Sequence, residues 1–191
     1  MRILFCGVGA LGSTAAMLCR NVDATLAFVD FDRVESKNVL AQAYVKQSIG
    51  RNKAEALKLQ LHNFFGIKAE AFGVRLRADN VDALCREMDL LVDCFDNRQS
   101  REVLSRYARA SGKALVHAGI SGDGAFGIVR WDERFQPDAE DTAGQATCEG
   151  GEHLPFIGQV AAALARIIQD FVERGARRDV MVTLAAVTPT A

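Results

Sequence analysis

A glycine pattern near the N-terminus restricts the fold of this chain more than any other feature. The run RILFC is apolar and rich in β-prone residues, GVGALGS follows it, and TAAMLCR has the composition of a helix. Gly7, Gly9 and Gly12 therefore form a GxGxxG pattern between a strand and a helix. The first glycine permits a tight turn, the second lets backbone approach a phosphate, and the third lets helix and strand pack closely. The pattern predicts the start of a nucleotide-binding unit.

The segments that follow alternate between strand and helix. We expect further strands over residues 24–32, 67–74, 89–95, 113–120, 125–131 and 180–187, and helices over 52–65, 79–88, 100–111 and 154–175. Because crossover helices connect parallel strands, this order predicts an α/β fold with a Rossmann-like, doubly wound and mostly parallel sheet. The short GDG before residue 125 indicates a hairpin, and hence a C-terminal antiparallel extension.

One long segment, residues 132–153, is polar and glycine-rich. It exceeds the usual length of a connection in a compact domain, so we expect a crossover loop that is either disordered or functional. The chain has 191 residues, of which 49% are hydrophobic and 25% charged, without an internal repeat. These properties fit one soluble globular domain over residues 1–191.

Charge and composition argue against several other classes of protein. The formal net charge is -1 and no long basic run is present, so nothing indicates nucleic-acid binding. Neither a membrane-spanning stretch nor a signal peptide is evident, which favours a cytoplasmic protein without a membrane association. The five cysteines are scattered without a CxxC pair, so we expect neither a disulfide framework nor bound zinc. Those in apolar segments are expected to be core residues.

Acidic and amide residues gather after the predicted strands. Asp30 lies at the end of the second strand, 18 residues after Gly12, where an acid can bond a ribose hydroxyl. An NAD-dependent oxidoreductase would share this opening, so these residues indicate a nucleotide without saying which. The later Lys53 and Asp96 favour a triphosphate, because charge that moves onto pyrophosphate requires cations to balance it.

With these segments the sequence resembles the ThiF/MoeB/HesA family, relatives of the ubiquitin-activating enzymes. The resemblance lies in GVGALGS, VDFDRVESKN, IGRNKAEA, VDCFDNRQSR and TCEGGEHLPFIGQVAAAL, in the family's order. It implies a Rossmann-like sheet that binds ATP and Mg²⁺ and adenylates the C-terminal carboxylate of a small ubiquitin-like or sulfur-carrier protein. We expect a homodimer, or a heterodimer with a related chain, because the apolar run VLAQAYV and the helix over 154–175 could be buried in an interface, although the same residues could be core.

The resemblance also implies a role for each matching residue. Asp96 would organise the metal during adenylation, and Cys148 would attack the acyl adenylate. The nucleotide would be bound by Gly7, Gly9, Gly12, Asp30, Asp32, Asn38, Lys53, Asn97 and Arg101. Other interpretations remain open, because Asp and Asn also cap helices and a loop cysteine is often inert. His62 and His117 are expected to be structural, the first on a helix and the second at a strand end.

The sequence departs from the family's pattern in one place that bears on catalysis. Ala41 stands where relatives carry an arginine soon after the Asn38 position. Arg33, Lys37 or Lys46 could supply the missing cation, or a second chain could. The departure keeps open a non-catalytic or half-active subunit that binds a carrier or partner chain.

Overall fold

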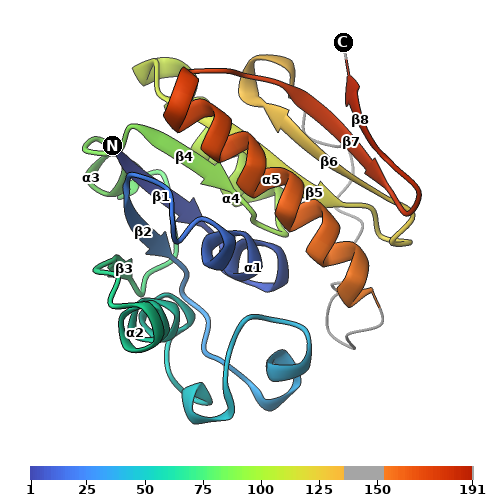
Figure 1. Ribbon diagram of the computed structural model, residues 1–191. Coiled ribbons are helices and arrows are strands. Elements are labelled where there is room, and N and C mark those ends of the chain that lie inside the picture. The colour runs from blue at the N-terminus through green and yellow to red at the C-terminus, as the bar shows by residue number, and fades with distance from the viewer. Residues whose placement is uncertain (136–152, 191) are drawn as a thin grey trace.

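A single eight-stranded sheet forms the centre of the molecule (Figure 1). The computed structural model describes residues 1–135 and 153–190. The strands are β1 (Arg2–Cys6), β2 (Thr25–Val29), β3 (Glu70–Phe72), β4 (Leu90–Asp93), β5 (Ala114–Ile120), β6 (Phe126–Trp131), β7 (Asp179–Thr183) and β8 (Val187–Thr190). They lie in the order β3-β2-β1-β4-β5-β6-β7-β8, parallel as far as β5 and antiparallel beyond it. The predicted fold class is confirmed.

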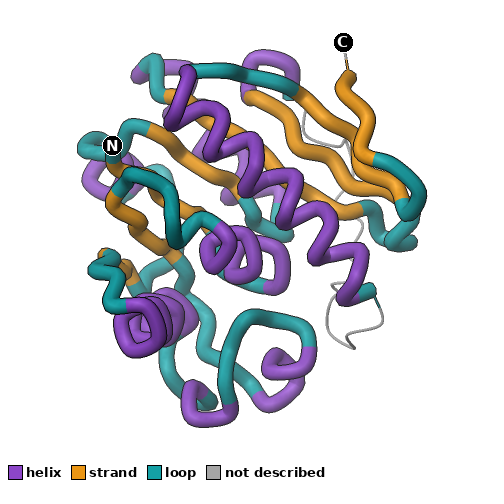
Figure 2. The backbone as a smooth tube through the Cα atoms, in the orientation of Figure 1, coloured by secondary structure: helices purple, strands orange, loops and turns teal. Residues whose placement is uncertain are grey.

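Helices cover both faces of this sheet (Figure 2). The α-helices are α1 (Ala10–Leu18), α2 (Lys53–Phe65), α3 (Val81–Cys85), α4 (Arg98–Ser111) and α5 (Leu154–Arg174). Short 3-10 helices are η1 (Ser36–Leu40), η2 (Lys46–Ser48) and η3 (Asp132–Arg134). Helices α1, α2 and α5 pack on one face, whereas α3 and α4 pack on the other. In the described part of the chain, no helix is long and apolar enough to cross a membrane.

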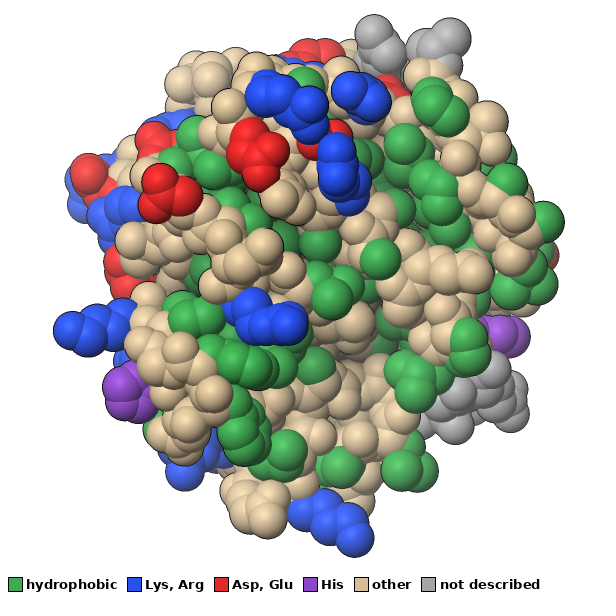
Figure 3. Space-filling model, viewed as in Figure 1, with side chains coloured by type: hydrophobic (Ala, Val, Ile, Leu, Met, Phe, Trp, Pro, Cys, Tyr) green, Lys and Arg blue, Asp and Glu red, His purple; other side chains and the backbone are tan. Residues whose placement is uncertain are grey.

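The C-terminal end of the sheet differs from the prediction. We expected one strand over residues 180–187, but β7 and β8 form an antiparallel hairpin there. Thr183 and Ala186 close its turn with two backbone hydrogen bonds of 2.8 and 3.3 Å. The turn contains no Gly, Pro, Asn or Asp, so the sequence carries none of the usual turn signals. Leu184 and Val187 are 70% and 55% exposed, and hydrophobic side chains lie on this side of the surface (Figure 3).

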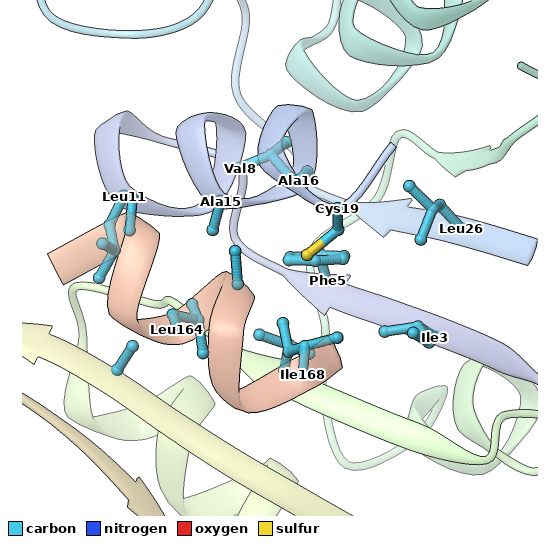
Figure 4. Packing of buried hydrophobic residues seen from close by; sticks show 14 of the residues in the cluster. Ile3, Phe5, Val8, Leu11, Ala15, Ala16, Cys19, Leu26, Leu164 and Ile168 are labelled. Carbon is cyan, nitrogen blue, oxygen red and sulfur yellow. The ribbon is translucent and has the colours of Figure 1, made fainter. Parts of the chain in front are cut away.

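Close packing of α1 and α5 builds the larger of two hydrophobic clusters (Figure 4). Ala15 and Ala16 on α1 are fully buried, and the small side chain of Ala15 points toward α5, which carries Leu164 and Ile168. In this view Phe5 of β1 lies between the two helices, beside Cys19. Such burial stabilises the folded state by about 25 cal/mol for each Å² of apolar surface removed from water. The long apolar helix α5 is therefore part of the hydrophobic core on this face of the sheet.

The strand order reverses on either side of β1, since β2 lies on one side and β4 on the other. The turn after β1 and the carboxyl ends of β2 and β4 therefore meet at one edge of the sheet. Such a switch point is where open α/β sheets bind ligands.

Candidate functional site

The glycine turn after β1 has the geometry that the sequence predicts. Gly7 adopts φ +82°, a left-handed conformation that side chains disfavour. A Cβ on Gly12 would stand 2.1 Å from the Gly7 carbonyl oxygen, so only glycine lets α1 lie this close to the turn. A Cβ on Gly9, the N-cap of α1, would meet nothing within 4 Å, and no side chain caps the helix there. Helix N–H groups beside open space are suited to an anion.

Asp30 ties this turn to the end of β2. Its Oδ2 accepts from the Val8 backbone N–H at 2.8 Å, and its Oδ1 accepts from the Asp32 backbone N–H at 2.9 Å. Burial raises the pKa of this carboxyl, and the two backbone hydrogen bonds oppose that rise. Each carboxylate oxygen has two lone pairs, so Asp30 retains acceptor capacity for a ligand hydroxyl.

Lys53 is brought to the same edge by the start of α2. Although a lysine, it is only 8% exposed, and its Nζ lies 3.2 Å from Asp32 Oδ2. Its backbone N–H donates to the Asp32 carbonyl at 2.8 Å. Asn52 caps α2 and donates its Nδ2 to the Asp30 carbonyl at 2.8 Å. The cation is thereby fixed beside the carboxyl end of β2 and cannot move freely in solvent.

Asn38 and Ala41 lie in the loop between β2 and α2 and are both buried. Asn38 is 4% exposed, and its Oδ1 accepts from the Glu35 backbone N–H at 2.8 Å, which stabilises η1. Ala41 is 0% exposed, so a long side chain there would displace packed neighbours. Of the other cations considered, Arg33 donates to the Gly50 carbonyl at 2.6 Å and Lys46 is exposed on η2.

The turn between β4 and α4 carries the second half of the candidate site. Asn97 is the N-cap of α4 and accepts from the Ser100 backbone N–H at 2.9 Å, so the capping interpretation holds for it. Asp96 is exposed, with one long contact of 3.5 Å from Asn97 Nδ2. It is therefore the carboxylate of this turn that is available to a ligand.

Arg101 points back into the protein. Its Nε and Nη2 donate to the Phe95 carbonyl, the former at 2.8 Å, and Nη2 also donates to the Ala118 carbonyl at 3.0 Å. Its side chain is 17% exposed. These contacts hold the β4–α4 turn against β5. Cys148 lies outside the described residues.

Three features of the site were not found from the sequence. Tyr44 is buried and donates its hydroxyl to the Val8 carbonyl at 2.6 Å, which joins the long loop to the glycine turn. A cavity of about 500 Å³ opens beside Phe31, which follows the end of β2. It is lined by Phe31, Gly73, Val74, Arg75, Arg77, Asp79 and Asn80. The Arg75 guanidinium carbon lies 3.8 Å from the Phe31 ring centroid.

The third feature is a buried ionic network around His117. This residue is interior to β5 and not at a strand end as expected, and it lies between the carboxylates of Asp93 and Asp132. The pairing of β4 with β5 could have indicated this contact, because it places Asp93 opposite His117.

A metal at this edge would have few protein ligands. Among the described residues, no group of three or more His, Cys, Asp or Glu side chains is placed to hold one. Mg²⁺ is commonly bound through one or two carboxylates together with substrate phosphates. Asp32 follows β2 and Asp96 follows β4 at the same edge of the sheet, and both have the oxygen chemistry for that mode. The predicted absence of zinc stays a prediction.

Together these features place the chain in a defined class: a doubly wound α/β protein with a glycine turn, an acid after β2 and an Asp-Asn turn after β4 at its switch point. Within that class it belongs to the ThiF family, whose family model matches residues 1–168.

Curated relatives share sequence with most of this chain, and solved structures share its fold. The chain is 29% identical over 175 residues to the adenylyltransferase and sulfurtransferase UBA4 of Lodderomyces elongisporus, covering 86% of this chain and 38% of that protein. The adenylyltransferase and sulfurtransferase MOCS3 of Caenorhabditis briggsae is 25% identical, over 85% of this chain and 43% of that one. A crystal structure of E. coli MccB with ATP has a TM-score of 0.76 at 13% identity, covering 99% of this chain and 63% of that chain. The chain thus spans about two fifths of these curated relatives.

Proposed function

We propose that this chain is an ATP-dependent adenylyltransferase that activates the C-terminal carboxylate of a small ubiquitin-like or sulfur-carrier protein. The observation that carries the proposal is the arrangement of Lys53, Asp32 and the exposed Asp96 around an open glycine turn. A dehydrogenase has no need of a buried lysine and a free carboxylate beside that turn. The family, and the names of UBA4 and MOCS3, support the same reaction class.

In the proposed reaction a carboxylate oxygen of the carrier attacks the α-phosphorus of ATP. The bond to the β-phosphate oxygen breaks, so the products are an acyl adenylate and pyrophosphate. The N–H groups at the start of α1 would face the phosphates, and Asp30 would accept from a ribose hydroxyl. Lys53 would balance phosphate charge, while Asp96 and Asp32 would hold magnesium. When bound with ATP, magnesium supplies compensation for the charge that develops on pyrophosphate.

Asn38, Asn97 and Arg101 are assigned supporting roles in this proposal. Each uses a side-chain atom to bond backbone. Asn38 Oδ1 accepts from Glu35, Asn97 Oδ1 accepts from Ser100, and Arg101 donates to the Phe95 carbonyl before Asp96. They would hold the loops that carry the nucleotide-binding groups. Cys148 would act afterwards, because a thiolate is a strong nucleophile toward an acyl adenylate.

The test is the exchange of labelled pyrophosphate into ATP, measured with a small ubiquitin-like carrier that ends in Gly-Gly. Asp96→Ala should abolish carrier-dependent exchange, whereas Cys148→Ser should leave it nearly intact. Asp23→Ala is the matched control, since Asp23 is exposed between α1 and β2 at the opposite edge. Equal loss in Asp96→Ala and Asp23→Ala would contradict the assignment. Calorimetry that finds tight NAD binding and no response to ATP with Mg²⁺ would contradict the proposal itself.

A second candidate is a half-active subunit, and Ala41 is the observation that favours it. The buried alanine leaves the loop between β2 and α2 without the arginine of relatives. A partner chain would supply that cation in a homodimer or a heterodimer with a related chain. Helix α5 leaves little apolar surface for such an interface, because it buries most of its apolar side chains against this chain's own sheet and α1. Low exchange by isolated monomer that rises on adding a partner chain would favour this candidate.

A further inference from the structure

His117 has an unusual environment for a buried histidine. The ring is 0% exposed, and its Nδ1 lies 2.7 Å from Asp93 Oδ2 while its Nε2 lies 2.9 Å from Asp132 Oδ1. The ring also stacks on Phe135 with centroids 3.8 Å apart. Three segments distant in sequence, β4, β5 and η3, are joined through this one side chain.

The two carboxylate contacts determine the protonation state of the His117 ring. A neutral imidazole has one N–H donor, so its second nitrogen would direct a lone pair at a carboxylate. Both contacts are satisfied when the ring carries both protons and a positive charge. Burial lowers the pKa of His117, but the hydrogen bonds with Asp132 and Asp93 outweigh it and raise the pKa.

Other charged groups balance the two carboxylates. Arg101, from α4, lies 3.7 Å from Asp93 Oδ2. Arg109, also on α4, donates its Nε to Asp132 Oδ2 at 2.6 Å, and the Ser105 hydroxyl donates to Asp132 Oδ1. Because each carboxylate has cationic partners on two sides, the network is satisfied without a ligand.

The network reaches the candidate site through Asp93. Its Oδ1 accepts from the Phe95 backbone N–H at 2.9 Å. Arg101 holds the carbonyl of the same residue at 2.8 Å. The residue immediately before Asp96 is therefore fixed on both its amide and its carbonyl side, and one of these supports depends on the carboxylate that His117 orients.

We propose that His117 is a positioning residue: by contacting Asp93 and Asp132 together, it fixes the β4–α4 turn from which Asp96 projects. Fixing the turn would also place Asp96 for magnesium binding. That consequence rests on the proposed function, whereas the effect of His117 on the turn does not. Residues of this kind that orient a ligand through another group commonly change affinity by about 10- to 100-fold when replaced.

Hydrogen exchange of backbone amides tests the turn directly. In His117→Leu, the Phe95 amide, which donates to Asp93, should exchange at least about tenfold faster, while the amides of β1 keep their protection. In Asp132→Asn the Phe95 amide should stay protected, because the new amide can donate to a neutral ring that still donates to Asp93. His62→Leu, at an exposed position on α2, is the control. Unchanged exchange in His117→Leu, or faster exchange throughout the chain, would overturn the proposal.

A double-mutant cycle tests the link to Asp96. His117→Leu should weaken binding of ATP with Mg²⁺ by about 10-fold or more, and should add little in the Asp96→Ala background, because it acts through that carboxylate. Additive losses would mean a general structural role and would overturn the proposal. If His117→Leu does not fold, His117→Gln serves the same comparison, since its amide can meet only one carboxylate. A wild-type chain that binds no ATP would refute the proposed function, and amide exchange would still decide the positioning role.

Discussion

Gly9 and Gly12, the second and third glycines of the GxGxxG pattern, should respond differently to substitution by alanine. Gly12→Ala introduces a Cβ at 2.1 Å from the Gly7 carbonyl oxygen, a backbone atom that cannot rotate aside. Helix α1 must therefore shift away from β1, within a cluster in which Ala15 and Ala16 are fully buried. Overpacking of a dense core costs about 1–3 kcal/mol, and the backbone position of this clash favours the upper end. Gly9→Ala meets nothing within 4 Å and should cost about 1 kcal/mol or less through the poorer N-cap.

Urea unfolding followed by fluorescence of the single tryptophan, Trp131, measures this difference. With a slope of about 2 kcal/mol per molar, a loss of about 3 kcal/mol lowers the midpoint by about 1.5 M. Trp131 is 2% exposed, so its emission should change on unfolding. Gly9→Ala should keep the wild-type midpoint within about 0.5 M and yet bind ATP with Mg²⁺ more weakly, because its methyl group occupies the space before the helix N-terminus. A Gly12→Ala protein as stable as wild type would refute the packing argument.

Three further outcomes are expected. Lys53→Met should lower affinity for ATP with Mg²⁺ by about 10- to 100-fold, as loss of a charged hydrogen bond of about 1.5–3 kcal/mol implies. Calorimetry measures this loss, with Lys58→Met, at a half-exposed position on the same helix, as the control, and equal effects would contradict the phosphate role. The pKa of Asp132 is lowered to about 2, in spite of burial, by hydrogen bonds from His117, Arg109 and Ser105. Its folded-state value lies below its unfolded value of about 3.9, so its contribution to stability is present above about pH 4 and is lost as pH falls toward 2. Unfolding of Asp132→Asn should show a smaller loss across that window, and an identical acid profile would count against the network. Elemental analysis should find no stoichiometric zinc, and one zinc per chain would overturn the reasoning from cysteine spacing.

Local sequence signals predicted those parts of the fold that depend on neighbours in the chain. Gly66 and Gly112 end α2 and α4 in the left-handed conformation, with φ of 70° and 68°. The alternation of apolar strands with helices predicted the parallel sheet, and the short GDG predicted the β5–β6 hairpin. The β7–β8 hairpin was missed because its turn is closed by Thr183 and Ala186, which carry little turn preference of their own.

In the candidate site, too, sequence predicted the residues whose geometry is set by their neighbours in the chain. The glycine pattern and Asp30 could be placed from sequence, because a strand, a turn and a helix in succession already set their geometry. The directions of long polar side chains could not. Arg101, expected at the nucleotide, donates to backbone carbonyls, and Asn38 caps its own 3-10 helix, because buried N–H and C=O groups must be satisfied by whichever partner the fold brings within reach.

By itself, the sequence determined the succession of strands and α-helices as far as β7, the tight turn that only glycine permits at positions 7 and 12, and the family to which the chain belongs. Only the tertiary structure decided that Lys53 meets Asp32, that Tyr44 reaches Val8, and that His117 lies between Asp93 and Asp132. The reason is physical: backbone geometry and periodicity act over a few residues, whereas an ion pair forms between groups that packing places within a few ångströms, whatever their separation along the chain.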